Sequence, residues 1–161
     1  MKLLIIRHAD AGSHDPARYP DDTLRPITAK GRKQHRKVAT RLKKRDLVPE
    51  LLLASPWLRA WETAEVTRAE TGCPAPVACE ALAQAPDLAK LGRMIGARDP
   101  DAVIALVGHE PWTGELAALL LAGEKRGMAI DFPKSGVMGL TLDTLAAGEA
   151  TLTFFWRPKG D

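Results

Sequence analysis

The sequence predicts an α/β fold, a three-layer α/β/α sandwich around a mostly parallel central sheet. Three short apolar runs, at residues 3–6, 51–54 and 102–107, have the composition and length of buried strands. A stretch with helical periodicity follows each run, so we expect parallel strands joined by helical crossovers. A length of 161 residues fits one domain, residues 1–161, with a sizeable core.

Charged and imidazole side chains follow the ends of these three predicted strands. Arg7 and His8 come directly after the first strand, Arg59 follows the second, and His109 and Glu110 follow the third. The carboxyl ends of parallel strands lie at one edge of a sheet, where open α/β folds bind their ligands, so we expect these residues to converge. Two cations and two imidazoles without a cluster of cysteines or carboxylates favour a phosphate pocket over a metal site.

The composition is that of an ordinary soluble globular protein, with 45% hydrophobic and 27% charged residues. No apolar run approaches the roughly 18 residues of a membrane span, and no signal peptide precedes the first strand, so no membrane association is expected. The formal net charge of +3 is too small to indicate nucleic-acid binding. Cys73 and Cys79 cannot build a disulfide framework or a zinc site, which predicts reduced thiols in a cytoplasmic protein.

Residues 11–26, rich in Gly, Asp and Pro, form a long loop, and loops of this length at this edge of a sheet tend to be functional. Thr28 has the position of an N-cap for a helix that ends near residue 45. The inward stripe of this helix is expected to be His35, Val38, Ala39 and Leu42. His35 lies away from any strand end and is expected to be structural.

The remaining faces of this helix are strongly basic between Lys30 and Arg45. A charge run of this kind is commonly a solvated face. The alternative is a docking surface for an acidic protein partner, which the basic helix would attract by electrostatic steering.

The segment after the second strand should begin a helix, with Ser55 as its cap and Pro56 at the favoured first position. Arg59 would then lie one turn into the helix, near the positive end of its dipole, where an oxyanion is stabilised. Thr63 falls on the same face and should support Arg59 through packing or a hydrogen bond. Gly72 is expected to end the helix.

The rest of the chain is predicted to alternate short strands and helices. A short strand is expected near Val77, helices over residues 87–97 and 111–123, and closing strands over residues 136–142 and 150–156. The inward faces of the two helices should carry Leu88, Leu91, Ile95, Leu116, Leu119 and Leu120.

Trp57 and Trp112 each lie two or three residues after the start of a site motif, at Ser55 and His109. One interpretation is core packing at helix starts. The other is that both rings wall a substrate pocket around the leaving group, through apolar or stacking contacts.

The ordered motifs resemble those of the histidine phosphatase superfamily, also called phosphoglycerate mutase-like. They are Arg-His-Ala from Arg7, Ser-Pro-Trp-Leu-Arg-Ala-x-x-Thr from Ser55, and Gly-His-Glu-Pro from Gly108. The short length and Arg-Pro-Ile-Thr-x-x-Gly from Arg25 are similar to the SixA-type phosphohistidine phosphatases of bacteria. The resemblance covers residues 2 to about 156, and Ala9 stands where the family usually has Gly.

This resemblance implies a phosphoglycerate mutase-like fold without a large cap insertion, and a phosphatase that forms a covalent phosphohistidine intermediate. It assigns His8 as the nucleophile and His109 as the stabiliser of the oxyanion, and it places Arg25 near the phosphate site. Arg7 and Arg59 can each give bidentate hydrogen bonds to phosphate. Neither a cofactor nor a metal ion is expected, because these cations already supply the positive charge.

The general acid is less clear from the sequence. Many relatives keep a Glu where Gln84 stands here, and an amide cannot donate the proton. Glu110, directly after His109, is the first candidate, because another branch of the superfamily uses an acidic residue there. Asp10 and Glu80 are the alternatives.

Three functions fit these residues. The first is a phosphatase for phosphohistidine on a protein, and the second is a phosphatase for a small phosphomonoester. The third is a phosphate-binding module without catalysis, which the intact set of arginines and histidines disfavours. Candidate substrate-binding residues are Arg25, Ser55, Trp57 and Trp112.

Overall fold

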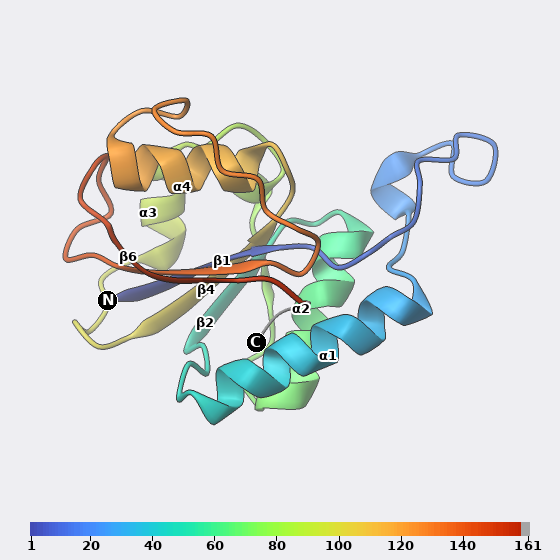
Figure 1. The fold of residues 1–161 in the computed structure, drawn as a ribbon, viewed down its shortest axis with the longest axis horizontal. Helices are drawn as coiled ribbons and strands as arrows, with labels where there is room; N and C mark the ends of the chain where they lie inside the picture. The colour runs from blue at the N-terminus through green and yellow to red at the C-terminus, as the bar shows by residue number, and fades with distance from the viewer. Residues whose placement is uncertain (159–161) are drawn as a thin grey trace.

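A six-stranded sheet forms the middle layer of the molecule (Figure 1). The computed structural model describes residues 1–158. The strands are β1 (Lys2–Arg7), β2 (Leu51–Ala54), β3 (Val77–Ala78), β4 (Val103–Gly108), β5 (Val137–Thr141) and β6 (Thr151–Trp156). Their order is β3-β2-β4-β1-β5-β6. Strands β1 to β4 are parallel to one another, β5 is antiparallel to β1, and β6 is antiparallel to β5. The predicted mostly parallel sheet is confirmed.

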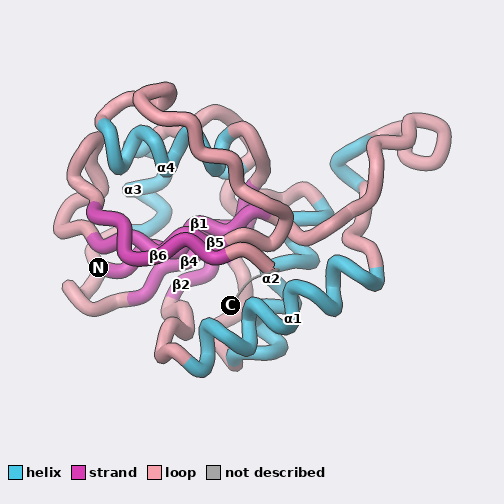
Figure 2. Tube along the Cα trace, in the orientation of Figure 1, coloured by secondary structure: helices cyan, strands magenta, loops and turns pink. Residues whose placement is uncertain are grey.

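Helices cover both faces of this sheet, as the predicted three-layer sandwich requires (Figure 2). On one face lie α1 (Ala29–Lys44) and α2 (Leu58–Thr71), and on the other lie α3 (Leu88–Ile95) and α4 (Trp112–Ala122). Two short 3₁₀ helices, η1 (Asp22–Leu24) and η2 (Glu80–Leu82), lie in the connections. None of the helices in residues 1–158 is long and apolar enough to cross a membrane.

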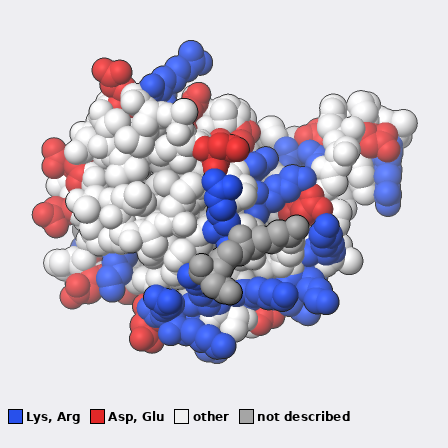
Figure 3. All heavy atoms as spheres, in the orientation of Figure 1, with Lys and Arg blue, Asp and Glu red and all other residues white. Residues whose placement is uncertain are grey.

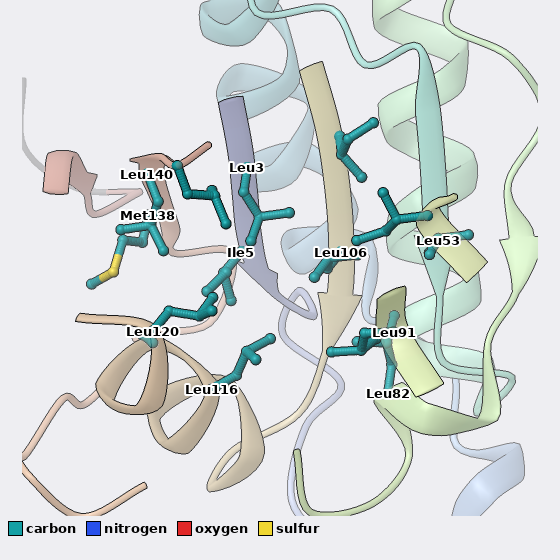
Figure 4. Close-up of a cluster of buried hydrophobic side chains, with 14 of the residues drawn as sticks. Leu3, Ile5, Leu53, Leu82, Leu91, Leu106, Leu116, Leu120, Met138 and Leu140 are labelled. Carbon is teal, nitrogen blue, oxygen red and sulfur yellow. The ribbon is translucent and has the colours of Figure 1, made fainter. Parts of the chain in front are cut away.

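The alternation of side chains along β1 explains why both faces need a cover. Leu3 and Ile5 point into the core beneath α3 and α4 (Figure 4), whereas Leu4 and Ile6 pack toward α1 and α2. All four side chains are fully buried. An apolar run without polar alternation is the pattern expected of a strand buried on both faces.

Most helix ends follow from local sequence, as predicted. The Thr28 hydroxyl accepts the Gly31 N–H at 2.9 Å and caps α1, and Gly72 and Gly123 end α2 and α4 in the left-handed region, at φ 78° and 81°. The predicted buried stripe of α1 is confirmed. In the other helices, Leu88 and Leu119 are only half-buried, so their predicted inward position is only partly met.

Strands β1 and β4 lie side by side, and the chain leaves them toward opposite faces of the sheet. After β1 it continues to α1, and after β4 it continues to α4. Arg7 and Gly108 are paired in the register of the two strands, so His8 and His109 follow at the same level. In open α/β folds such a divergence marks the ligand-binding crevice, at the carboxyl edge of the sheet.

Candidate active site

His8 and His109 face each other in this crevice. Their ring centroids are 5.2 Å apart, and the rings are inclined by 51°. Both side chains are almost completely buried, with 7% and 2% of their surface exposed. The His8 N–H donates to the Gly108 carbonyl at 3.0 Å, so strand pairing itself sets the separation of the two imidazoles.

The hydrogen bonds of His8 define which ring nitrogen is free. Nδ1 lies 2.7 Å from the carbonyl oxygen of Ala9, which can only accept, so Nδ1 carries the proton. The lone pair is therefore on Nε2. Burial, reinforced by the positive charges of Arg59 and Arg7, lowers the pKa of His8 to about 4. At neutral pH the imidazole of His8 is uncharged.

His109 is held from behind by Ser55. Its Nε2 lies 2.7 Å from the Ser55 hydroxyl oxygen, and burial together with the neighbouring His8 and arginines lowers its pKa to about 3. Ser55 is fully buried behind His109 and contacts that imidazole, so its predicted substrate-binding role stays a prediction. Ser55 is not the helix cap. The capping position is Trp57, and α2 begins at Leu58.

Arg59 reaches the site from the first turn of α2, as predicted. Thr63 donates its hydroxyl proton to the Arg59 carbonyl at 2.6 Å, which confirms the supporting hydrogen bond. The guanidinium donates to the backbone carbonyl of Asp22 at 2.8 Å and lies 3.2 Å from the Asp22 carboxylate. Arg59 is 5% exposed, so this charge is almost fully removed from water.

Asp22 links Arg59 to Arg25, and the sequence interpretation missed it. Its carboxylate accepts from Arg25 Nε at 2.8 Å, and this hydrogen bond, with the charge of Arg59, holds the pKa of Asp22 below its usual range. Arg25 also donates to the carbonyls of Ala11 and Gly12, which ties the two ends of the long loop together. The three-residue spacing of Asp22 and Arg25 was the available signal for this ion pair.

Unused hydrogen-bond donors gather at this point of the molecule. Arg7 donates one terminal N–H to the Phe132 carbonyl, but its Nε is buried and has no partner within residues 1–158. Arg59 Nε and His109 Nδ1 are in the same condition. Native proteins leave few such groups unpaired, so this set has spare capacity for an anion with several oxygens.

Trp57 and Trp112 both pack against His109. Their ring centroids lie 4.6 and 6.2 Å from that of His109, and the Arg59 guanidinium lies 4.9 Å from the Trp57 ring centroid. Both indoles are only half-buried, as a wall of a site would be. Trp112 and His109 also border a cavity of about 10 Å³ beside Gln84, which has room for about one water molecule.

Glu110 does not face the crevice, which contradicts its predicted role as general acid. One carboxylate oxygen accepts the Phe132 N–H at 2.9 Å, and the other accepts the Gly114 N–H at 3.4 Å. The carboxylate thus anchors the segment that follows α4. The same segment supplies the carbonyl that Arg7 holds.

The alternative acids are no better placed. Asp10 forms an ion pair with Lys134, and this contact holds the pKa of the Asp10 carboxyl below its usual range. Glu80 is exposed in η2. The predicted convergence of Arg7, His8, Arg59 and His109 is therefore present, without any of the three proposed proton donors.

Comparison with known proteins shows the family of this chain. A model of the histidine phosphatase superfamily (branch 1) matches residues 3–84. The chain is 39% identical to an uncharacterized protein of Picosynechococcus sp., over 87% of this chain and 84% of that protein. It is 31% identical to the phosphohistidine phosphatase SixA of Escherichia coli, over 98% of this chain and 92% of that enzyme.

A solved structure also matches the fold of this chain. The structure of the protein histidine phosphatase SixA complexed with tungstate superimposes with a TM-score of 0.81 at 28% identity, covering 98% of this chain and 97% of that one. The chain belongs to the histidine phosphatase superfamily and is a phosphatase of the SixA type.

Proposed function

We propose that this phosphatase transfers the phosphoryl group of its substrate to His8 Nε2 and then to water. The observation that carries the proposal is the hydrogen bond from His8 Nδ1 to Ala9, which leaves Nε2 unprotonated beside the unused donors of Arg7, Arg59 and His109. A bond forms between Nε2 and phosphorus while the bond to the leaving group breaks, and the leaving group departs with the electron pair and takes up a proton from solvent. Water then attacks phosphorus and gives up a proton to solvent, and Nε2 leaves with the electron pair.

The two arginines and His109 would act on the oxygens of the phosphoryl group. Phosphoryl transfer needs positioning and charge neutralisation more than covalent help from the protein. Arg7 and Arg59 supply fixed positive charge, so the proposed mechanism uses no metal ion. The tungstate in the similar SixA structure is an oxyanion, which is the class of ligand that these residues suit.

We propose phosphohistidine on a protein as the substrate. The E. coli relative is named a phosphohistidine phosphatase, and the structural relative a protein histidine phosphatase. The chemistry at this site supports the same choice. The P–N bond of phosphohistidine is labile and imidazole is a moderate leaving group, so the reaction depends less on a general acid than phosphoester hydrolysis does. None of the three proposed acids is available here.

A small phosphomonoester is the alternative substrate. The half-buried indoles of Trp57 and Trp112 would then contact its leaving group. Arg25, which pairs with Asp22 beside Arg59, would contact the phosphate only after that ion pair opened.

We further propose that α1 docks the protein substrate. The helix carries eight cations and no acidic residue, and Lys and Arg side chains gather over it in Figure 3. Glu62 and Glu70 of α2 pair with only two of these cations, Arg32 and Arg36. The amino end of α1 is hydrogen-bonded to Asp10, close behind His8, so a protein held along the helix can present a phosphorylated side chain to the crevice.

Rapid quenching with labelled substrate tests the chemical step. Label should be trapped on His8 as a phosphoramidate, which is acid-labile and alkali-stable, and His8→Ala should abolish the labelling. Acid-stable label, or most of the activity surviving in His8→Ala, would contradict the proposed nucleophile.

Substrate class and docking need a second experiment. Turnover of a histidine-phosphorylated acidic protein, free phosphoimidazole and a panel of small phosphoesters should favour the first two substrates. Charge reversal at Arg36, Arg41 and Lys44 should slow only the protein reaction and weaken its salt dependence. An equal effect on protein and small substrates, or none on either, would leave α1 as a solvated face.

A further inference from the structure

His35 is an unusual member of the buried stripe of α1. Its side chain has no exposed surface and lies in a stripe otherwise formed by Val38, Ala39 and Leu42. Burial lowers its pKa to about 4, so the imidazole is neutral at physiological pH. A buried imidazole needs hydrogen-bond partners to offset its desolvation, and both of its nitrogens have one.

The partners suit one neutral tautomer of the imidazole. Nε2 lies 2.9 Å from the Thr67 hydroxyl oxygen, and that hydroxyl lies 3.1 Å from the Thr63 carbonyl, to which it can donate. With that donation Nε2 donates to Thr67, and Nδ1 accepts from the Ser135 hydroxyl at 3.2 Å.

Both arms of this arrangement end on the backbone of the nucleophile. The Ser135 N–H donates to the His8 carbonyl at 3.1 Å. On the other side, the Thr63 hydroxyl accepts the N–H of Ala9 at 2.9 Å. The His8 carbonyl and the Ala9 N–H belong to one peptide unit, so Ser135, His35, Thr67 and Thr63 close a ring of hydrogen bonds around it. We call this set the His35 ring.

The orientation of that peptide unit decides where the nucleophile points. The Ala9 carbonyl, which follows this unit, accepts from His8 Nδ1 and thereby selects the tautomer with a free Nε2. A rotation of the His8–Ala9 peptide would move the α-carbon of Ala9 and its carbonyl, and with them the imidazole. Ser135 has a positive φ of 59°, which a non-glycine residue keeps only when its surroundings hold it.

We propose that His35 is a positioning residue for catalysis: through the His35 ring it fixes the peptide unit after His8 and so aims Nε2 at phosphorus. This inference rests on the proposed nucleophilic role of His8. The proposal gives His35 a function that an apolar side chain could not perform, although this residue lies on a helix and far in sequence from the strand ends.

The test compares His35→Leu with His35→Gln and Val38→Ala. Leu fills a similar volume and removes both hydrogen bonds, whereas Gln can restore a donor or an acceptor at the position of the imidazole. Val38→Ala removes volume from the same buried stripe without changing any residue of the His35 ring, so it controls for lost stability. With a small phosphate substrate, His35→Leu should lower kcat by roughly 10- to 100-fold with little change in KM, because displacement by about 1 Å is costly.

His35→Gln should recover part of that loss. Val38→Ala should keep the kcat of the unmodified protein when each protein is assayed at the same number of degrees below its own melting temperature. The nitrogen chemical shifts of the His8 ring provide a readout that needs no turnover. In the unmodified protein they should report a proton on Nδ1, and in His35→Leu they should report a mixture of tautomers.

Thr67→Val serves if His35→Leu fails to fold, because it keeps the shape of the side chain and opens the ring at one point. Unchanged kcat and unchanged His8 nitrogen shifts in the folded variants would overturn the positioning role, as would a loss of kcat in Val38→Ala equal to that in His35→Leu. Failure of the proposed function would look different, because the unmodified protein would then not form phosphohistidine at His8.

Discussion

Three buried histidines should make this protein sensitive to mild acid. His8, His35 and His109 have pKa values lowered to about 4, 4 and 3, chiefly by burial. In the unfolded chain each imidazole titrates near 6.5. Because the folded values lie below the unfolded one, the stabilisation is complete above about pH 6.5 and is lost as the pH falls toward 4.

The size of the effect follows from the difference in proton uptake. A pH of 5 lies 1.5 units below the pKa of an unfolded imidazole, which is therefore almost fully protonated. A folded imidazole with a pKa of about 4 is still mostly neutral at this pH. This lowers the free energy of unfolding by about 2 kcal/mol for each histidine relative to neutral pH, and by about 6 kcal/mol for the three together. A typical domain is stable by only about 5–15 kcal/mol, so the loss brings this protein close to unfolding.

Urea unfolding at pH 7.5 and at pH 5 measures this loss. His35→Gln should reduce the difference between the two pH values by about 2 kcal/mol, because one of the three imidazoles no longer binds a proton on unfolding. Val38→Ala, which changes the same buried stripe without removing an imidazole, is the matched control and should leave the difference unchanged. A difference below about 1 kcal/mol in the unmodified protein would refute the reasoning.

Other single changes test separate parts of the site. Arg59→Ala removes a charge-assisted donor and should lower turnover roughly 100- to 1000-fold with the fold intact by circular dichroism; a loss of tenfold or less would place Arg59 outside the phosphate site. Glu110→Gln keeps one acceptor for the Phe132 N–H, so thermal unfolding should show a loss of about 1 kcal/mol, with similar relative activity on good and poor leaving groups. Selective damage to poor leaving groups would restore Glu110 as an acid. Gly31→Ala would place a methyl group against the backbone of Asp10, so its melting temperature should fall clearly, and an unchanged value would show that this contact is loose.

The features that sequence predicted well depend on local patterns or on a general rule of topology. The apolar runs gave the buried strands, and Thr28 and Gly72 marked helix ends because capping involves residues only a few positions apart. The convergence of His8 and His109 followed from the rule that parallel strands end at one edge.

Apart from the helix cap wrongly placed at Ser55, the main errors and omissions concern contacts between residues far apart in the sequence. Glu110 turns away from the crevice because its partner N–H belongs to Phe132, 22 residues later in the chain. The hydroxyl that completes the surroundings of His35 lies 100 residues away, on Ser135. Asp22 meets Arg59 only because the long loop folds back, 37 residues before it in sequence.

The pairing of Arg7 with Gly108 makes the positions of His8 and His109 independent of the loop that follows β1. The distance between the imidazoles is set by two central strands and not by the connections that leave them. The tip of the long loop, about residues 13–20, projects beyond the body of the molecule (Figure 1), so its length and sequence can change without removing Asp22 or Arg25, which contact Arg59 and the ends of the loop. Under the proposed mechanism a new loop could be grafted at this tip, whereas an insertion of one residue in β1 or β4 should put the two imidazoles out of register and abolish turnover.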